Sequence, residues 1–271
     1  MRQMFTALLC LGMAAGRAGA QPAAHPVFLD ELTSPEVRDL QRAGTTTILI
    51  ATAGQEQKGP HMVTGEHKFV MQYNAERIAR ALGNAIVAPV ITYVPEGSWD
   101  APLKGHMAKA GSITLPEDRF VELLVHAGKS LRAGGFTTVI LIGDSGGNQS
   151  GMKAAADALN VAWKDIGGRA LFIGDYYTKS TADIRTYLGG LGYSMEAIGS
   201  HAGMVDTSEL LFVNPALVRR ERLAPSGGSP ESGVSGDPTK ASAELGKQLV
   251  QIKIDNALAQ IRSSLSARGG N

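Results

Sequence analysis

Residues 137–148, TTVILIGDSGGN, are the most informative stretch of this chain. Residues 138–142 form a short β-branched and apolar run, which is the composition of a buried strand. The run ends at the glycine-rich turn 143–147, and residues 149–159 then predict a helix. A strand, a tight glycine turn and a helix commonly support an active site in an α/β fold. The same residues fit more than one catalytic site, so the rest of the chain must discriminate between them.

The surrounding chain predicts an α/β protein with a largely parallel sheet. Further apolar runs predict strands over 45–51, 84–94 and 169–174. Predicted helices lie between and around them, over 34–43, 73–82, 116–132, 149–159 and 241–265. Strands that alternate with helices favour a parallel sheet covered on both faces. Ligands of such sheets bind where the strands end, so the loops 54–67 and 143–148 should meet at one edge.

The first twenty residues predict a secretory signal peptide, which leaves residues 21–271 as a single domain. Arg2 begins it, an apolar core follows, and an Ala-Gly-Ala cleavage site precedes Gln21. Cleavage would remove Cys10, the only cysteine, and so would exclude a disulfide or a thiolate site from the mature protein. We therefore expect a periplasmic or secreted protein that has no membrane segment after cleavage.

The charge balance excludes nucleic acid as an expected partner. The whole chain carries a net charge of +1, and the predicted signal peptide contains two arginines and no acid. The mature protein would thus carry −1, which gives no reason to bind a polyanion. A small molecule is the expected partner.

Three polar segments are candidates for chemistry. The first, 52–68, contains Glu56, Lys58, His61 and His67, and its carboxylate and imidazole groups suit zinc or manganese. The second is the turn with Asp144 and Ser145, where capping of the following helix is the purely structural alternative to a catalytic role. The third, 198–211, contains His201 and Asp206. A histidine at a predicted helix start is well placed as a general base, because its pKa lies near neutrality.

Two serine-based interpretations compete for the glycine turn. GDSGG flanks the nucleophile of trypsin-like proteases, but that fold is all-β and there the histidine precedes the serine. The G-x-S-x-G elbow of α/β-hydrolases has the correct strand and helix context, with Ser145, Asp175 or Asp183, and His201 in the expected order. This second interpretation lacks an oxyanion loop of the HGGG type and leaves the first polar segment without a role.

A third interpretation accounts for all three segments. Residues 55–61 (QEQKGPH) resemble the E-Q-H-G-P-H loop of the creatininase family, and 143–148 (GDSGGN) resemble its N-G-H-G-G-N turn. Residues 201–208 (HAGMVDTS) resemble its H-A-G-x-x-E-T-S, and 233–238 (GVSGDP) its G-V-x-G-D-P. The resemblance implies a three-layer α/β/α sandwich with a mostly parallel central sheet, often assembled as a homohexamer. It also implies hydrolysis of a non-peptide C–N bond with two divalent ions, zinc or manganese.

The chain departs from the family pattern at several ligand positions. Lys58 replaces a ligand histidine, His67 stands where the bridging aspartate falls, and Ser145 replaces the histidine of the metal turn. From the resemblance we expect Glu56, His67 and Asp144 to hold a divalent ion. Lys58 would supply the charge of the second ion, since a fixed cation also stabilises an oxyanion.

The sequence thus predicts a metal-dependent hydrolase of a small amide or cyclic amide, assembled as a homo-oligomer. In the mechanism that the resemblance implies, a metal-bound water would attack, His201 would move the proton, and Asp206 would orient this base or join the ligands. The substrate would contact four further residues, His61, Trp99, His106 and Ser145. Two alternatives stay open: a metal-free serine hydrolase that uses Ser145 and His201, and an inactive protein that binds a small molecule on the same fold.

Overall fold

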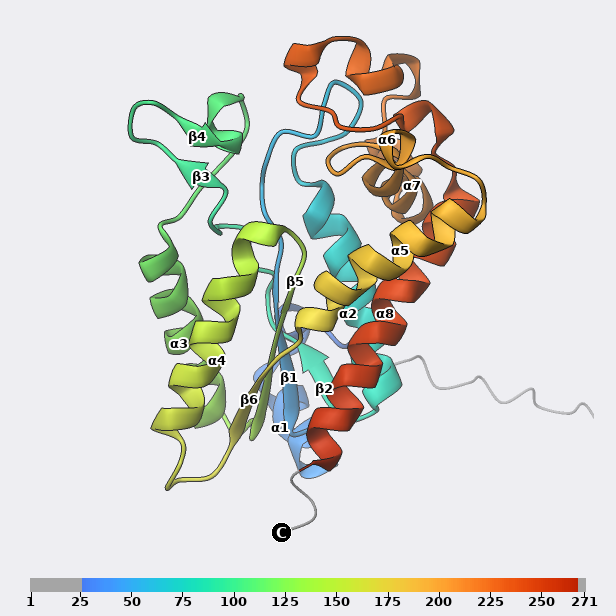
Figure 1. The fold of residues 1–271 in the computed structure, drawn as a ribbon. Coiled ribbons are helices and arrows are strands. Elements are labelled where there is room, and N and C mark those ends of the chain that lie inside the picture. The colour runs from blue at the N-terminus through green and yellow to red at the C-terminus, as the bar shows by residue number, and fades with distance from the viewer. Residues whose placement is uncertain (1–25, 268–271) are drawn as a thin grey trace, which may run out of the picture.

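The computed structural model describes residues 26–267, so the predicted signal peptide lies outside the described residues. Its centre is a parallel sheet of four strands in the order β2-β1-β5-β6 (Figure 1). The strands are β1 (Thr47–Thr52), β2 (Ala85–Val87), β5 (Thr138–Gly143) and β6 (Arg169–Phe172). Every residue of β1 and β5 is buried, as their continuous apolar runs predict for strands covered on both faces.

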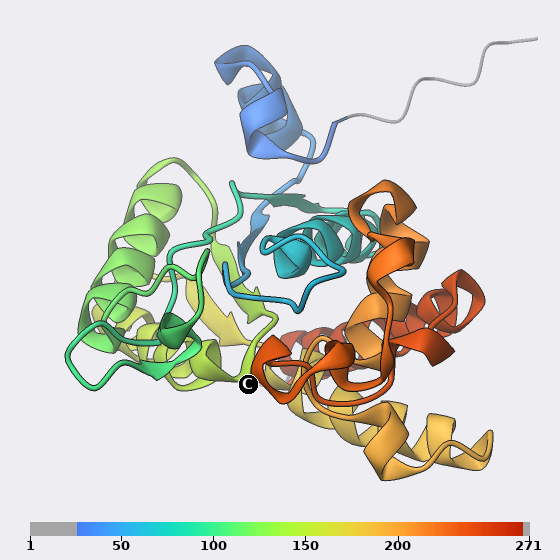
Figure 2. The ribbon, with the colours of Figure 1, turned by 90° about the horizontal axis from the view of Figure 1, so that it is seen from above.

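Helices cover both faces of the sheet. They are α1 (Ser34–Arg42), α2 (Glu66–Leu82), α3 (Glu117–Ala133), α4 (Gln149–Ala162), α5 (Thr178–Gly190), α6 (Met195–Ile198), α7 (Met204–Val213) and α8 (Ala243–Ser266). Figure 2 shows the green α3 and α4 on one side of the strands and the red α8 on the other. This is the predicted three-layer α/β/α arrangement.

Alternate residues of the strands supply two apolar cores. Leu49, Ile140 and Ile142 pack toward α2 and α8, whereas Ile48 and Leu141 belong to the core with α3 and α4. This alternation follows from the two-residue period of a strand. Burial on both faces therefore fixes the register of the central strands, and with it the edge at which their ends meet.

The structure corrects several predicted bounds. The helix predicted at 73–82 begins at Glu66, which places His67 in the first helical turn instead of a loop. The strand predicted over 84–94 is shortened to Ala85–Val87, and beyond Pro89, which has no N–H to donate to a ladder, Ile91 forms an isolated bridge with Thr52. Helix α5 was not predicted, since its sequence TKSTADIRTYLGG contains few apolar residues and many weak helix formers.

A small antiparallel ribbon lies beyond the sheet edge. It consists of β3 (Gly97–Ser98) and β4 (Lys104–Gly105), and a single 3-10 turn, His106–Ala108, follows it directly. The ribbon stands apart from the layers in Figure 1. Among residues 26–267, no helix combines the length and the apolar character that crossing a bilayer would demand.

Candidate active site

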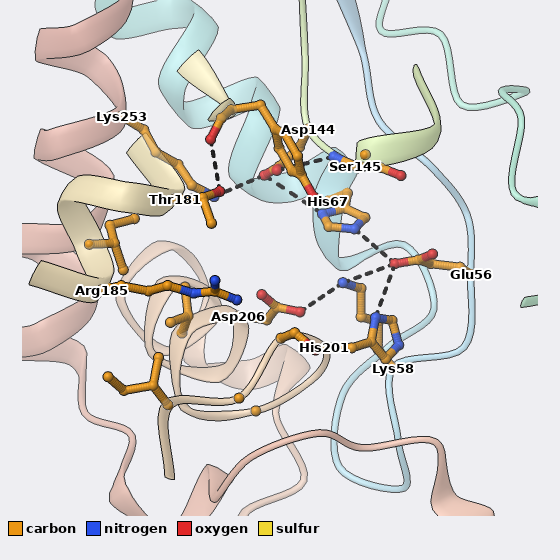
Figure 3. A pocket seen from close by; sticks show the side chains of 18 of the residues that line it. Glu56, Lys58, His67, Asp144, Ser145, Thr181, Arg185, His201, Asp206 and Lys253 are labelled. Atoms are coloured by element: carbon orange, nitrogen blue, oxygen red, sulfur yellow. Dashed lines mark hydrogen bonds and ion pairs between the residues drawn. The ribbon is translucent and has the colours of Figure 1, made fainter. Parts of the chain in front are cut away.

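A cavity of about 280 Å³ lies at the carboxyl ends of the central strands. Glu56 and Lys58 follow β1, Asp144 and Ser145 follow β5, and Asp206 lies in the first turn of α7. Figure 3 shows these side chains converging with His67 and His201 on one pocket. The site therefore lies at the edge that the parallel sheet predicts.

Lys58 is a fully buried cation at the floor of this cavity. Its side chain is 1% exposed, and its Nζ lies 2.8 Å from Asp206 Oδ2, 3.1 Å from Glu56 Oε1 and 3.2 Å from Glu66 Oε2. Burial alone would lower the pKa of Lys58, but these three carboxylates raise it well above its usual value. The ammonium group is thus a fixed positive charge among acids.

His67 is held between carboxylates on both sides of its ring. Its Nε2 lies 2.9 Å from Glu56 Oε1, and its Nδ1 lies 3.2 Å from Glu66 Oε2 and 3.6 Å from Asp144 Oδ2. Burial alone would lower the pKa of His67, but Glu66 and Asp144 raise it well above its usual value. A protonated imidazole has no free lone pair for a metal ion. This geometry does not favour the predicted set of Glu56, His67 and Asp144 as metal ligands.

A second buried lysine pairs with Asp144. Lys253 Nζ, on α8, lies 3.1 Å from Asp144 Oδ2 and 2.6 Å from Glu209 Oε2. Burial would raise the pKa of Asp144, but Lys253 lowers it far below its usual range. Sequence analysis missed Lys253 and Glu209. The sequence does contain one signal for a buried charge here: Lys253 lies on the same helical face as the apolar residues Leu249 and Val250 of α8.

The environment of Glu209 predicts a pH-dependent stability effect. Burial raises the pKa of Glu209 to about 8, from 4.5 when unfolded, so the folded state retains a proton across that range. The contribution of Glu209 to stability is therefore lost as the pH rises from about 4.5 through about 8. In Glu209→Gln, whose amide cannot titrate, we expect the free energy of unfolding relative to wild type to increase by at least about 1 kcal/mol between pH 5 and pH 9.

Urea denaturation at the two pH values measures this difference. Glu244→Gln, at an exposed position in the first turn of α8, is the matched control and should show no such change. If the difference in unfolding free energy between variant and wild type were the same at both pH values, Glu209 would be ionised in the folded protein throughout the range.

His201 lies in a sharp turn ahead of α7. The helix begins at Met204, three residues later than predicted, and His201 instead forms an isolated bridge with Ser235. The next residue, Ala202, has a φ of 49°, and its N–H donates to Asp206 Oδ2 at 2.8 Å. This turn directs the imidazole toward Glu56, whose Oε1 lies 3.6 Å from His201 Nδ1.

The tautomer of His201 follows from its surroundings. His201 Nε2 lies 2.8 Å from the carbonyl oxygen of Gln57, which can only accept, and 3.0 Å from the side-chain Nε2 of Gln57, which can only donate. We assign the proton to Nε2 because the carbonyl oxygen is the nearer partner, and this assignment leaves a free lone pair on Nδ1. Burial lowers the pKa of His201 to about 4, so the ring is neutral at neutral pH. A backbone carbonyl that fixes the tautomer in this way is typical of histidine metal ligands.

Glu56, His106 and His201 form the candidate metal site among residues 26–267. One ligand atom from each of the three residues lies within 4.8 Å of the others. His106 Nε2 is 2.9 Å from Glu56 Oε2, and the two imidazole rings are 4.6 Å apart between centroids. Sequence analysis had assigned His106 to substrate binding. The ribbon β3–β4, which positions it, has too few residues to signal this role.

The remaining predicted residues differ in their placement. His61 is fully buried behind the cavity, where its Nε2 lies 3.0 Å from Thr207 Oγ1, and Trp99 is 54% exposed. Neither lines the cavity, so this structure does not place them where a substrate in the cavity would contact them. Ser145 does line it, with a strained φ of 83°. Its Oγ donates to Glu96 Oε1 at 3.0 Å, and no hydrogen bond to His201 is present among the described residues, so the serine-hydrolase interpretation lacks its base.

The sequence of this chain is similar to that of known proteins. The family model described as creatinine amidohydrolase matches residues 30–261. A "Mycofactocin precursor peptide peptidase" of Mycobacterium tuberculosis (strain CDC 1551 / Oshkosh) is 25% identical over 241 residues, covering 79% of this chain and 84% of that protein.

Solved structures share the fold. A crystal structure of creatinine amidohydrolase (creatininase) superimposes with a TM-score of 0.74 at 19% identity, covering 89% of this chain and 98% of that one. A second structure, titled "Creatininase Mn", has a TM-score of 0.73 at 19% identity and covers 89% and 99% of the two chains.

Proposed function

Because this chain belongs to the creatininase family of amidohydrolases, we propose that it hydrolyses the C–N bond of a small amide with one divalent metal ion. The observation that carries the proposal is the convergence of Glu56, His106 and His201 at the cavity. One carboxylate and two imidazoles are the ligand set of a common class of catalytic zinc sites, which keep a further position open. Manganese also accepts these donors.

The two-ion site implied by the family resemblance does not fit these residues. The Lys58 ammonium contacts all three of the carboxylates that surround it, and His67 uses both ring nitrogens toward acids. Each of these groups places a positive charge where a second ion would need a lone pair. We therefore propose that the Lys58 ammonium supplies the positive charge that a second metal ion would otherwise provide, which supports the predicted role of Lys58.

Each side chain has a distinct role in the proposed reaction. A divalent ion at the trio would polarise the amide carbonyl and activate water as a nucleophile. His201 would bind it through Nδ1, so this nitrogen is not available to carry a proton. Asp206 is left for that role: its Oδ2 accepts from Lys58 and from the N–H of Ala202, and no described residue hydrogen-bonds to Oδ1.

Asp206 is ionised, as a proton acceptor must be, and its low pKa makes it a weak base whose conjugate acid readily gives the proton on. Burial would raise the pKa of Asp206, but Lys58 and His67 lower it well below the usual range, so the group is ionised. Its side chain is 19% exposed and faces the cavity, whereas Lys58 behind it is closed off from solvent. We propose that Asp206 Oδ1 receives the proton of the attacking water and passes it to the leaving nitrogen.

Metal binding tests this proposal directly. We expect the wild-type protein to bind about one zinc or manganese ion. His106→Ala removes a side chain that is 31% exposed and should weaken binding at least about 100-fold, since even an outer-shell partner contributes about 10- to 100-fold. Competition with a chromogenic chelator measures the Kd. His126→Ala, on α3 and outside this cavity, is the control and should bind normally.

A wild-type protein that binds no ion would overturn the proposal. So would unchanged binding in His106→Ala, because the ion would then occupy other residues.

We also propose that the protein is exported and forms a homo-oligomer. Export is supported by the composition of residues 1–20, and oligomerisation by the family resemblance. N-terminal sequencing of the secreted or periplasmic protein and light scattering test the two points.

A further inference from the structure

One cationic side chain at the cavity has no partner of its own. Arg185, on α5, lines the cavity, and Figure 3 shows its guanidinium group reaching into the pocket on the side of Asp206. Among residues 26–267 no carboxylate forms an ion pair with it and no group hydrogen-bonds to it. Its five N–H donors are therefore available to a ligand.

The other cations of the cavity are already paired. Lys58 contacts three carboxylates, and Lys253 contacts two. Asp206, which lines the same cavity as Arg185, already pairs with Lys58 through Oδ2. Lys58 and Lys253 thus have carboxylate partners, whereas Arg185 on α5 presents a positive charge with no ion-pair partner among the described residues. That charge favours an anionic group on the substrate.

Apolar side chains also line the cavity that Arg185 lines. They are Ile184 from α5, Ile198 from α6 and Val205 from α7. A guanidinium group binds a carboxylate with two parallel hydrogen bonds, and the exposed Arg185 side chain is open to a ligand that enters the cavity. An apolar substituent next to a carboxylate fits this combination.

We propose that Arg185 binds the free carboxylate of the substrate, which is an N-acylated amino acid with an apolar side chain. This inference rests on the proposed function and deepens it. The acyl carbonyl then lies toward Glu56, His106 and His201, and the amino-acid part lies against α5. In the reaction the C–N bond breaks, a hydroxyl from water joins the acyl carbon, and a proton from water joins the nitrogen. The products are a carboxylic acid and a free amino acid.

Binding of a matched ligand pair tests the inference without requiring turnover. N-acetyl-L-leucine carries the carboxylate, and N-acetyl-L-leucinamide has the same shape without the charge. By calorimetry we expect wild-type protein to bind the acid about 10- to 100-fold more tightly than the amide, the range for a hydrogen-bonded charge pair. In Arg185→Gln this preference should vanish, while binding of the amide stays unchanged.

Two controls separate the possible outcomes. Arg38→Gln, at an exposed position on α1, should keep the preference, and Arg185→Lys should keep part of it because charge is retained without the bidentate geometry. Equal affinity of wild type for the two ligands, or a preference that survives in Arg185→Gln, would overturn the inference. If the acid binds preferentially through Arg185 but is not cleaved, the proposed function fails and the carboxylate site stands.

Discussion

Replacing Lys58 with methionine should destabilise the protein by about 3–5 kcal/mol, the cost of breaking a buried ion pair on one side. Methionine has a similar length and is apolar, so the change removes the charge and leaves little empty volume. Glu56, Glu66 and Asp206 would then face one another without the ammonium that lies within 3.2 Å of all three. Guanidinium chloride denaturation at pH 7 in the presence of a chelator measures the effect without a contribution from metal binding.

The pH dependence of the Lys58→Met effect identifies its electrostatic origin. Burial alone would raise the pKa values of Glu56 and Asp206, but Lys58 lowers them below their unfolded values. Their contribution to stability is therefore present above their unfolded pKa values and is lost as the pH falls. Without Lys58 these carboxylates protonate at higher pH. The difference between wild type and variant should therefore shrink between pH 7 and pH 4.

An exposed lysine provides the matched control for Lys58. Lys153 pairs with Asp157 at 2.7 Å on the surface of α4, where both side chains are about two-thirds exposed. Lys153→Met should change the free energy of unfolding by less than about 1 kcal/mol. A comparable small effect for Lys58→Met would show that water or an ion neutralises the acids in its place.

Replacing Asp206 with asparagine should lower kcat for amide hydrolysis by about 10²- to 10⁴-fold, the usual contribution of a positioned acid or base. Asparagine retains an oxygen that accepts from the N–H of Ala202, which lies 2.8 Å from Oδ2, so the turn before α7 is preserved. The metal ion should remain bound, because Asp206 is not among the three residues of the candidate metal site. Initial rates measure the loss of kcat, and the metal content of the same sample measures whether the ion remains bound.

His201→Ala separates the two proton carriers that the site allows. We expect this variant to lose the metal ion and turnover together, since His201 Nδ1 faces Glu56 in the trio. Retained metal in His201→Ala, with full activity in Asp206→Asn, would return the role of general base to His201, as sequence analysis predicted.

Local sequence patterns were sufficient to predict the fold and the place of the site. Strands β1 and β5 are continuous apolar runs, and such runs form buried parallel strands whatever the details of their neighbours. The turns that follow these strands must then meet at one edge. The order of the polar motifs along the chain also predicted the family, which the match over residues 30–261 confirms.

The chemical state of the site residues depended on contacts that no local pattern encodes. Lys58 and Asp206 are separated by 148 positions, and Asp144 and Lys253 by 109, yet each pair is in direct contact. Asp144 and Glu66 surround His67 and favour its protonated form, which changes a predicted ligand into a cation. His106 joins Glu56 and His201 because the ribbon β3–β4 carries it to the edge of the sheet.

Local patterns in the chain were enough to predict an α/β protein with acids, imidazoles and a lysine gathered at one edge of a parallel sheet. Contacts between distant segments then set which of these groups carry charge and which retain a lone pair for a metal ion. This division arises because the apolar runs that form buried strands are local in sequence. Protonation depends instead on burial and on the field of every charge within a few ångströms, wherever that charge lies along the chain.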